Sequence, residues 1–345
     1  AILVRVYGRS PTMNPISSRV KSLAITAAFL AVAAIPAQQT RAAASMTPIN
    51  ISFSTWTGYG PLVVGVQDGI FKKYGLDVKY SLIESPSLRR DALRTGRIDG
   101  AASTVDTFAR WAGQGAAPVQ VLGIDRSEGG DGIVAKKTIT SVKQLKGQTV
   151  AVNVGSTSEW FMYYVLRANG LSVNDINVLD MPDSSVAGST FRAGKVAVAV
   201  TWQPWLDRAE SAPFGHVLVS SKAYPNIIVD DFAFSASFIK AHPAAISKFV
   251  QAYFAAVNLV LTNPKQTYPI IGKFTGETVA GVTSDFTGVK LMDLAQSKAY
   301  FGTPSKHGPI YGIETQAADF WLSLHDMRGM PNINQSINST FQSGM

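Results

Sequence analysis

Cysteine is absent from this chain of 345 residues, and its absence excludes several kinds of chemistry. Without a thiol there is no cysteine nucleophile, no zinc site with cysteine ligands, no disulfide and no cysteine to carry a lipid anchor. The four histidines are scattered and show no metal-ligand spacing. No phosphate-binding loop and no G-x-S-x-G motif occurs. We therefore expect no metal, no cofactor and no catalytic residues.

Acidic residues are absent from the first 45 positions, where five basic residues lie. The formal net charge of +8 depends on that segment, since the rest of the chain has 26 basic and 23 acidic residues. No basic stripe interleaved with aromatic residues remains there, so nucleic-acid binding is not expected.

Long hydrophobic runs are also missing, because the longest one, "SLAITAAFLAVAAIPA" at 22–37, is about 16 residues and a membrane span needs about 20. Arg19 and Lys21 precede this run and small residues follow it, which is the pattern of a cleaved secretory signal. We expect residues 1–12 to be an upstream extension, Met13 to be the true start, and cleavage after Ala42 or Ala44. An exported protein without a lipid anchor would diffuse away from a cell with a single membrane, so the periplasm is the expected compartment.

The remaining chain has the composition of a globular protein, with 46% hydrophobic and 16% charged residues in the whole sequence. Its first stretch, "ISFSTWTGYGPLVVGVQDGIFKKYGLDV" at 51–78, predicts a strand, a tight turn, a helix and a second strand. Pro61 suits a first helical turn, and Gly75 suits the left-handed residue after a helix.

The same pattern returns about 98 residues later. "TVAVN" at 149–153 predicts a strand, "VGST" a glycine turn, and "SEWFMYYVLRAN" a helix that ends before Gly170. "LRTGRIDGAAST" at 93–104 aligns with "FRAGKVAVAVTW" at 191–202, and "GLDV" at 75–78 is echoed by "GLSV" at 170–173. The alignment matches Arg94, Gly96 and Arg110 with Arg192, Gly194 and Arg208. Although any doubly wound sheet repeats β-α-β units, the shared order and spacing predict two α/β units in tandem.

These segments, together with "SVKQLKGQTVAVNVGSTSEWF" and "KAHPAAISKFVQAYFAAV", resemble the nitrate, sulfonate and taurine-type periplasmic binding proteins of ABC importers. The resemblance covers residues 47 to about 260. It implies a two-lobed α/β flytrap, each lobe a doubly wound, mostly parallel sheet flanked by helices. The implied division is residues 46–135 in the first lobe, 136–226 in the second, and 227–345 returning to the first.

A ligand is expected between the lobes, because open α/β sheets bind ligands at the carboxyl ends of their strands. The turns "TWTGYGP" and "NVGSTSE" each present a helix N-terminus, which favours an anion. We expect the anionic or carbonyl end of the ligand on Gly155, Ser156 and Thr157.

Aromatic and acidic residues on the same loops predict an amine-like end, held by cation–π contact and by charge. Glu159 and Asp106 are the favoured carboxylates, and Glu128, Asp131 and Asp231 are weaker candidates. The predicted ligand-binding residues are Trp56, Tyr59, Ser103, Asp106, Gly155, Ser156, Thr157, Glu159, Trp160, Trp202 and Asp230.

The resemblance implies a monomer that passes a small molecule to an inner-membrane permease and its ATPase. Two alternatives stay open. The family has relatives of the same fold that act as enzymes in pyrimidine synthesis for thiamine, and a binding protein can also serve a receptor as a ligand sensor. Closure is expected at two hinges, "DRSEGGDG" at 125–132 and "YPNIIVDD" at 224–231.

Overall fold

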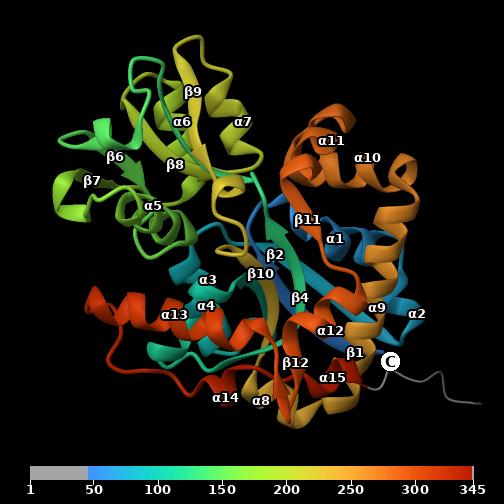
Figure 1. Cartoon of the computed structure of the whole chain (residues 1–345). Coiled ribbons are helices and arrows are strands. Elements are labelled where there is room, and N and C mark those ends of the chain that lie inside the picture. Colours follow the sequence, from blue (N-terminus) through green and yellow to red (C-terminus); the bar gives the residue numbers. More distant parts are fainter. Residues whose placement is uncertain (1–45, 344–345) are drawn as a thin grey trace, which may run out of the picture. The chain divides into compact units, whose positions relative to one another are not determined.

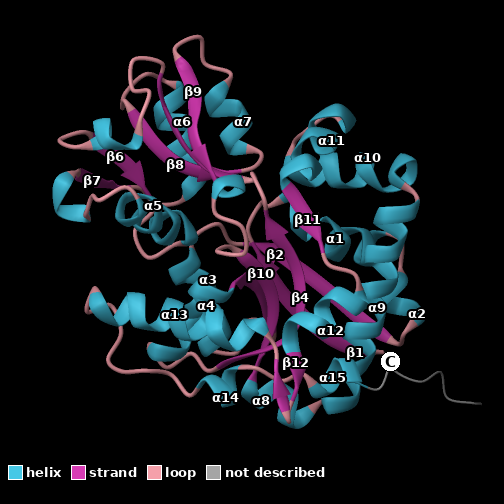
Figure 2. Ribbon diagram, viewed as in Figure 1, coloured by secondary structure: helices cyan, strands magenta, loops and turns pink. Residues whose placement is uncertain are grey.

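The computed structural model describes residues 46–343 and contains two β-sheets with helices packed on them (Figures 1 and 2). The predicted upstream extension and signal peptide, residues 1–44, lie outside the described residues. The predicted α/β architecture with two sheets is confirmed.

The first sheet has the strand order β11-β4-β10-β3-β1-β2. β1 pairs in parallel with β2 and β3, whereas β10 runs antiparallel to β3 and β4. The sheet is therefore mixed and not mostly parallel as predicted, because the chain returns to it through β10 in the opposite direction. Its strands are β1 (Thr47–Phe53), β2 (Leu76–Leu82), β3 (Gly100–Thr104), β4 (Pro118–Ser127), β10 (Val229–Ser235) and β11 (Val289–Leu291).

The second sheet has the order β7-β6-β8-β5-β9. β6 pairs in parallel with β7 and β8, and β5 runs antiparallel to β8 and β9. Its strands are β5 (Asp131–Lys136), β6 (Thr149–Val152), β7 (Asn177–Asp180), β8 (Val198–Trp202) and β9 (Gly215–Ser220). A separate hairpin pairs β12 (Gly302–Thr303) with β13 (Lys306–His307).

The predicted tandem units are visible in the strand pairing. β2-β1-β3 in the first sheet corresponds to β7-β6-β8 in the second, with the same parallel order and one antiparallel strand beyond it. Gly96 and Gly194 both have positive φ angles, 71° and 74°. The "GLSV" echo differs, because "GLDV" enters β2 directly whereas "GLSV" leads into a 3₁₀ turn before β7 begins at Asn177.

Helices cover the faces of both sheets (Figure 1). Those of the two repeats are α1 (Gly60–Gln67), α2 (Ile70–Lys73), α3 (Pro86–Arg94), α4 (Val105–Gly113), α5 (Thr157–Ala168), α6 (Ser184–Arg192) and α7 (Trp205–Glu210). Those that follow are α8 (Ala236–Ala241), α9 (Pro243–Thr262), α10 (Pro264–Thr275), α11 (Val279–Gly288), α12 (Leu294–Phe301), α13 (Pro309–Ser323), α14 (Ile333–Ser336) and α15 (Thr340–Ser343). Short 3₁₀ helices are η1 (Thr57–Tyr59), η2 (Val142–Leu145), η3 (Val173–Asp175) and η4 (Ser221–Ala223).

The helix predicted after Pro61 is interrupted, which corrects the sequence interpretation. Gly69 takes a left-handed conformation with φ of 66° and separates α1 from α2. Gly75 also has a positive φ, 77°, and ends the run as predicted. The apolar spacing continues through the break, so periodicity alone could not locate it.

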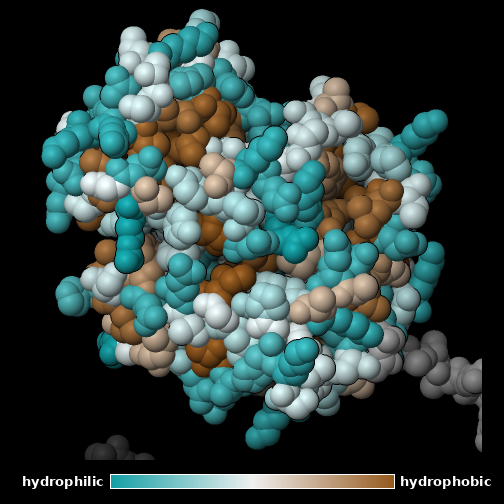
Figure 3. All heavy atoms as spheres, in the orientation of Figure 1, coloured by the Kyte–Doolittle hydropathy of each residue, from teal (hydrophilic) through white to brown (hydrophobic). Residues whose placement is uncertain are grey.

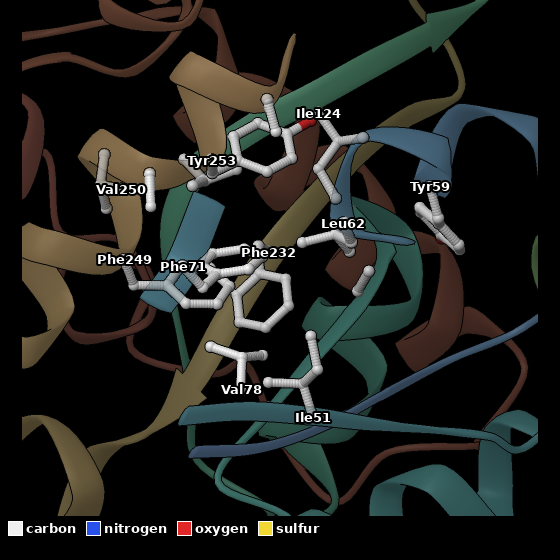
Figure 4. Close-up of a cluster of buried hydrophobic side chains, with 14 of the residues drawn as sticks. Ile51, Tyr59, Leu62, Phe71, Val78, Ile124, Phe232, Phe249, Val250 and Tyr253 are labelled. Carbon is white, nitrogen blue, oxygen red and sulfur yellow. The ribbon is translucent and has the colours of Figure 1, made fainter. Parts of the chain in front are cut away.

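The core of the first sheet is built around α9. Figure 4 shows Phe71, Phe232 and Phe249 together between the sheet and its helices. Among the described residues, α9 is also the one helix long and apolar enough to cross a membrane. More than half of the most apolar stretch of α9 is buried inside the protein, and the core helix of a soluble protein can have the same length and apolar composition.

The chain passes between the sheets twice in the regions named as hinges. β4 ends at Ser127 and β5 begins at Asp131, and β9 ends at Ser220 and β10 begins at Val229. β5 therefore precedes the predicted boundary at residue 136, and the boundaries and the closure motion stay predictions. On the face drawn in Figure 3, hydrophilic side chains surround separate apolar patches.

Candidate binding site

A narrow pocket of about 30 Å³ lies where residues of the two sheets approach each other. It is lined by loops at strand ends and by the first residues of helices, as expected for an open α/β sheet. Its lining residues are Ser54, Trp56, Tyr59, Pro86, Arg89, Ser103, Thr104, Thr107, Asp131, Ser156, Thr157, Trp202, Ile228 and Asp230.

The structure brings most of the predicted binding residues together at this pocket. Although residues 56 and 202 are far apart in the sequence, their indoles lie in the same lining. The predicted residues that line it are Trp56, Tyr59, Ser103, Ser156, Thr157, Trp202 and Asp230. Their roles in binding stay predictions.

Glu159 and Gly155 lie outside the pocket lining because they bond to each other. The Gly155 N–H donates to Glu159 Oε2 at 2.6 Å, so the carboxylate occupies an amide that we had assigned to a ligand anion. Burial is the main cause that raises the pKa of Glu159. The turn thus satisfies part of its own anion-binding capacity.

Asp106 and Trp160 also lie outside the lining. Asp106 is buried and accepts a hydrogen bond from the hydroxyl of the lining residue Thr107 at 3.3 Å. Burial raises its pKa to about 7. Trp160 packs edge-on against Phe320 and donates its indole N–H to the Ile227 carbonyl at 3.1 Å, which is the behaviour of a core residue.

The turn after β1 is held by four carboxylates. Four residues in five positions each donate a hydrogen bond to a different acid, and three of these bonds connect segments more than 60 residues apart. The pairs are Thr55 with Glu84 (2.6 Å), Trp56 Nε1 with Asp125 (3.0 Å), Thr57 with Asp285 (2.5 Å), and Tyr59 with Asp230. This network fixes the Trp56 and Tyr59 rings as walls of the pocket.

Gly58 is required by this arrangement. A Cβ atom at Gly58 would overlap Asp125 Oδ2 and Trp56 Nε1. A Cβ at Gly130 would overlap the far edge of the Trp56 ring in the same way. These two glycines therefore leave the space in which the indole reaches Asp125.

Arg89 is a pocket residue that sequence reasoning missed. It lies on α3, is 3% exposed, and donates through Nη1 to the Ile83 carbonyl. Its Nε–H is buried without a partner, and none of the ion pairs in residues 46–343 includes it. Burial lowers its pKa. Its position three and four residues before Ala92 and Leu93, on the buried face of α3, was the available signal.

Asp131 and Asp230 are two buried acids of the lining. Both are 3% exposed. Burial is the main cause that raises the pKa of Asp131 to about 7 and that of Asp230 to about 8. Asp131 was a weaker candidate in the sequence, because nothing local distinguishes it from Glu128.

Three hydrogen bonds join the two halves across the pocket, one of them between Thr107 Oγ1 and Thr157 Oγ1 at 3.3 Å. Trp202 Nε1 donates to the Thr55 carbonyl at 3.3 Å, and Thr104 Oγ1 lies 2.5 Å from Thr157 Oγ1. The pocket therefore combines a buried cation, buried acids, hydroxyls and aromatic rings. Such a lining can hold a small molecule that carries both an anionic and a cationic group.

Comparison with known proteins identifies relatives for most of the chain. A model described as the NMT1-like family matches residues 42–271. The taurine-binding periplasmic protein of Escherichia coli (strain K12) is 23% identical over 63% of this chain and 68% of its own length. A Brucella abortus (strain 2308) protein, named for binding without a stated ligand, is 22% identical over 68% of this chain and 73% of its own length.

Solved structures share the fold. The alkanesulfonate-binding protein from Xanthomonas axonopodis pv. citri, bound to MOPS, superposes with a TM-score of 0.72 at 17% identity. The match covers 86% of this chain and all of that one. The predicted resemblance and the predicted two-lobed α/β fold are both confirmed.

Proposed function

The chain belongs to the NMT1-like family, and on that premise we propose that it is a periplasmic solute-binding protein of an ABC importer. The observation that carries the proposal is the pocket, where Arg89 faces buried acids and indoles contributed by both sheets. The sulfonate-binding and taurine-binding relatives support the same function.

The proposed ligand is a small polar molecule with an anionic end and an amine-like end. Arg89 has a free buried N–H that suits an anion, and Ser156, Thr157 and Ser103 add hydroxyls. In the same lining, the carboxylates of Asp230 and Asp131 suit an ammonium group. These two acids replace Glu159 and Asp106 as our favoured amine partners, because they line the pocket and the other two do not.

Delivery completes the proposed function. The loaded protein, a monomer freed from its signal peptide and without a lipid anchor, passes the ligand to a permease and its ATPase at the inner membrane. Binding and not catalysis is proposed, because the lining suits both ends of a ligand but pairs no nucleophile with a base.

A thermal-shift screen of the exported full chain tests the function. Taurine, ethanesulfonate, nitrate, ethanolamine, neutral amino acids and pyrimidines represent the ligand classes. A ligand at 100 times its dissociation constant stabilises the folded protein by about 2.7 kcal/mol, and we expect the largest shift from a compound with both charges. No shift from any class up to millimolar concentration would contradict a solute-binding role.

A further inference from the structure

Asp125 and Asp230 form a pair of buried carboxylates, of which Asp230 lines the pocket and Asp125 lies outside the lining. They lie directly opposite each other on the antiparallel strands β4 and β10. Asp125 is fully buried and Asp230 is 3% exposed. Directly opposite residues of an antiparallel pair have side chains close together, so two ionised carboxylates would repel each other strongly here.

Each member of the pair has one donor. Trp56 Nε1 donates to Asp125 Oδ2, and the Tyr59 hydroxyl donates to Asp230 Oδ1. The second oxygen of Asp125, Oδ1, is buried without a partner. Neither carboxylate takes part in an ion pair among the described residues. The pair therefore lacks a cation, and one proton would relieve both the repulsion and the unpaired burial.

The groups around the pair add more negative charge than positive. Arg89 is the positive group that acts on Asp230, the Tyr59 hydroxyl is a neutral donor to it, and the buried Tyr253 hydroxyl has no hydrogen-bond partner. Burial, followed by mutual repulsion among the acids, raises the pKa of Asp125 well above its usual value. The titratable and charged groups that act on the pair from the surrounding elements are Tyr59, Arg89, Asp106, Asp131, Asp231, Tyr253 and Tyr300.

We propose that Asp125 and Asp230 hold one proton between them in the ligand-free protein, and that a cationic nitrogen of the ligand takes its place on binding. The pair carries one negative charge with its proton. When the ligand enters, the proton leaves to solvent, and two carboxylates with one ammonium again carry one negative charge. This inference rests on the proposed function only in its second half.

The shared proton is tested without a ligand. Chemical denaturation of the full chain from pH 5 to pH 9 gives the free energy of unfolding, and its slope against pH counts the protons that distinguish the folded and unfolded states. A raised folded-state pKa means that the folded protein holds the extra proton, so stability decreases as pH rises toward about 8. The double variant Asp125→Asn, Asp230→Asn should have a slope shallower by one proton per molecule.

Other proton counts contradict the proposal. If the slope of the double variant is shallower by two protons, each carboxylate holds its own proton in the parent. If the slope is unchanged, both carboxylates are ionised in the parent. Asp319→Asn, at an exposed site on α13, is the control and should leave the slope unchanged. If the double variant does not fold, the infrared carbonyl band of buried protonated carboxyls in the parent decides. In each single variant this band should lose the intensity of one group or shift. The absence of such a band in the parent at pH 6 would overturn the shared proton.

The exchange is tested with taurine and its nitrogen-free analogue ethanesulfonate. Calorimetric titration in phosphate and in Tris reports released protons, and we expect about one with taurine and none with ethanesulfonate. Because binding releases a proton, the affinity for taurine should increase about tenfold for each unit by which the pH is raised, up to about pH 8. Binding of ethanesulfonate alone, or of taurine without proton release, would overturn the exchange while leaving the solute-binding function intact. If neither taurine nor ethanesulfonate binds, aminosulfonates are not the ligand class and the proposed exchange is overturned for them. The denaturation experiment would still decide whether the carboxylates share a proton.

Discussion

The two repeats share a backbone plan, but the turns that follow their first strands are held in different ways. The turn after β1 is fixed by carboxylates 29 to 228 residues away. The turn after β6 closes on itself: Ser156 Oγ donates to the Asn153 carbonyl, the Ser158 N–H donates to Ser156 Oγ, and the Gly155 N–H donates to Glu159. The second turn also has longer bonds, from the Val154 N–H to Asp180 and between Thr157 and Thr104, but no bond of its backbone or side chains spans as many residues as the three longest of the first turn.

This difference separates shape from chemistry in a duplicated fold. Both repeats place a turn at the pocket, but the turn after β1 contributes an indole and a phenol, and the turn after β6 contributes the hydroxyls of Ser156 and Thr157. The buried cation, Arg89, comes from the first repeat, and a second indole, Trp202, comes from the second. At the offset of 98, Arg89 corresponds to Ala187, which is fully buried on α6. The repeats therefore differ in charge at this position, whereas the acids of the lining come from both sheets, Asp230 from the first and Asp131 from the second.

We expect the largest effect on ligand binding from Arg89→Ala, and alanine is the residue at the corresponding position of the second repeat, Ala187. Loss of a buried charged partner should weaken ligand binding by about 2 to 5 kcal/mol, or roughly thirtyfold or more. Arg89→Ala also removes the hydrogen bond to the Ile83 carbonyl, so we expect the ligand-free protein to lose about 0.5 to 1.5 kcal/mol of stability, less than the loss in binding. Calorimetry and denaturation measure the two quantities, with exposed Arg97→Ala as the control. Parent-like affinity in the Arg89 variant would contradict the bipolar site.

Trp202→Ala tests the aromatic side that the second repeat does contribute. Its indole is 8% exposed in the pocket lining and bonds to the Thr55 carbonyl. We expect a loss of about 1 to 3 kcal/mol in binding, from lost stacking and cation–π attraction. Trp205→Ala, at a neighbouring indole that packs on Arg208 outside the lining, is the matched comparison. Equal losses in both variants would indicate a general packing defect.

Gly58→Ala tests the remotely held turn. The added Cβ would overlap Asp125 and Trp56, so we expect a loss of about 1 to 3 kcal/mol in stability together with displacement of the Trp56 ring. Denaturant unfolding measures the first and tryptophan fluorescence the second. Gly312→Ala, where a Cβ would meet nothing within 4 Å, is the control. A Gly58 variant as stable as this control would mean that the turn adapts freely.

Arg208, the second of the duplicated arginines Arg110 and Arg208, tests a smaller effect, the rate of ligand release. Arg208 donates to the Thr275 and Gly276 carbonyls and pairs with Glu277, linking α7 to the α10–α11 turn. We expect Arg208→Met to speed ligand release by a few-fold, because a partly exposed pair contributes about 0.2 to 1 kcal/mol. Stopped-flow dissociation measures it. Exposed Arg192→Met is the control, and an unchanged release rate would assign Arg208 to static packing.

The smallest effect is expected from Glu159→Gln. The glutamine carbonyl can still accept the Gly155 N–H, so the locally closed turn should persist and binding should change less than about threefold. Calorimetric titration measures the ligand affinity of Glu159→Gln and of Asp106→Asn, the two acids that lie outside the lining. A loss comparable to that of Arg89→Ala would restore Glu159 as a ligand partner.

The sequence by itself determined the α/β units, their repetition and the glycines of the turns. These features follow from local spacing, because helix and strand periodicity and positive φ angles are set by residues close in the chain. The resemblance also predicted which loops meet, since two lobes that face each other bring the strand ends of both sheets to one cleft. Trp56, Tyr59 and Trp202 were found for that reason.

Only the tertiary structure decided which charged side chains enter the pocket. Asp131 and Asp230 line it, whereas Glu159 turns back to its own amide and Asp106 lies outside the lining. Arg89 points into the lining from a helix that reads as an ordinary polar segment. The direction of a side chain at a sheet edge depends on the partners it meets across the fold, and those partners are up to 228 residues away in the chain.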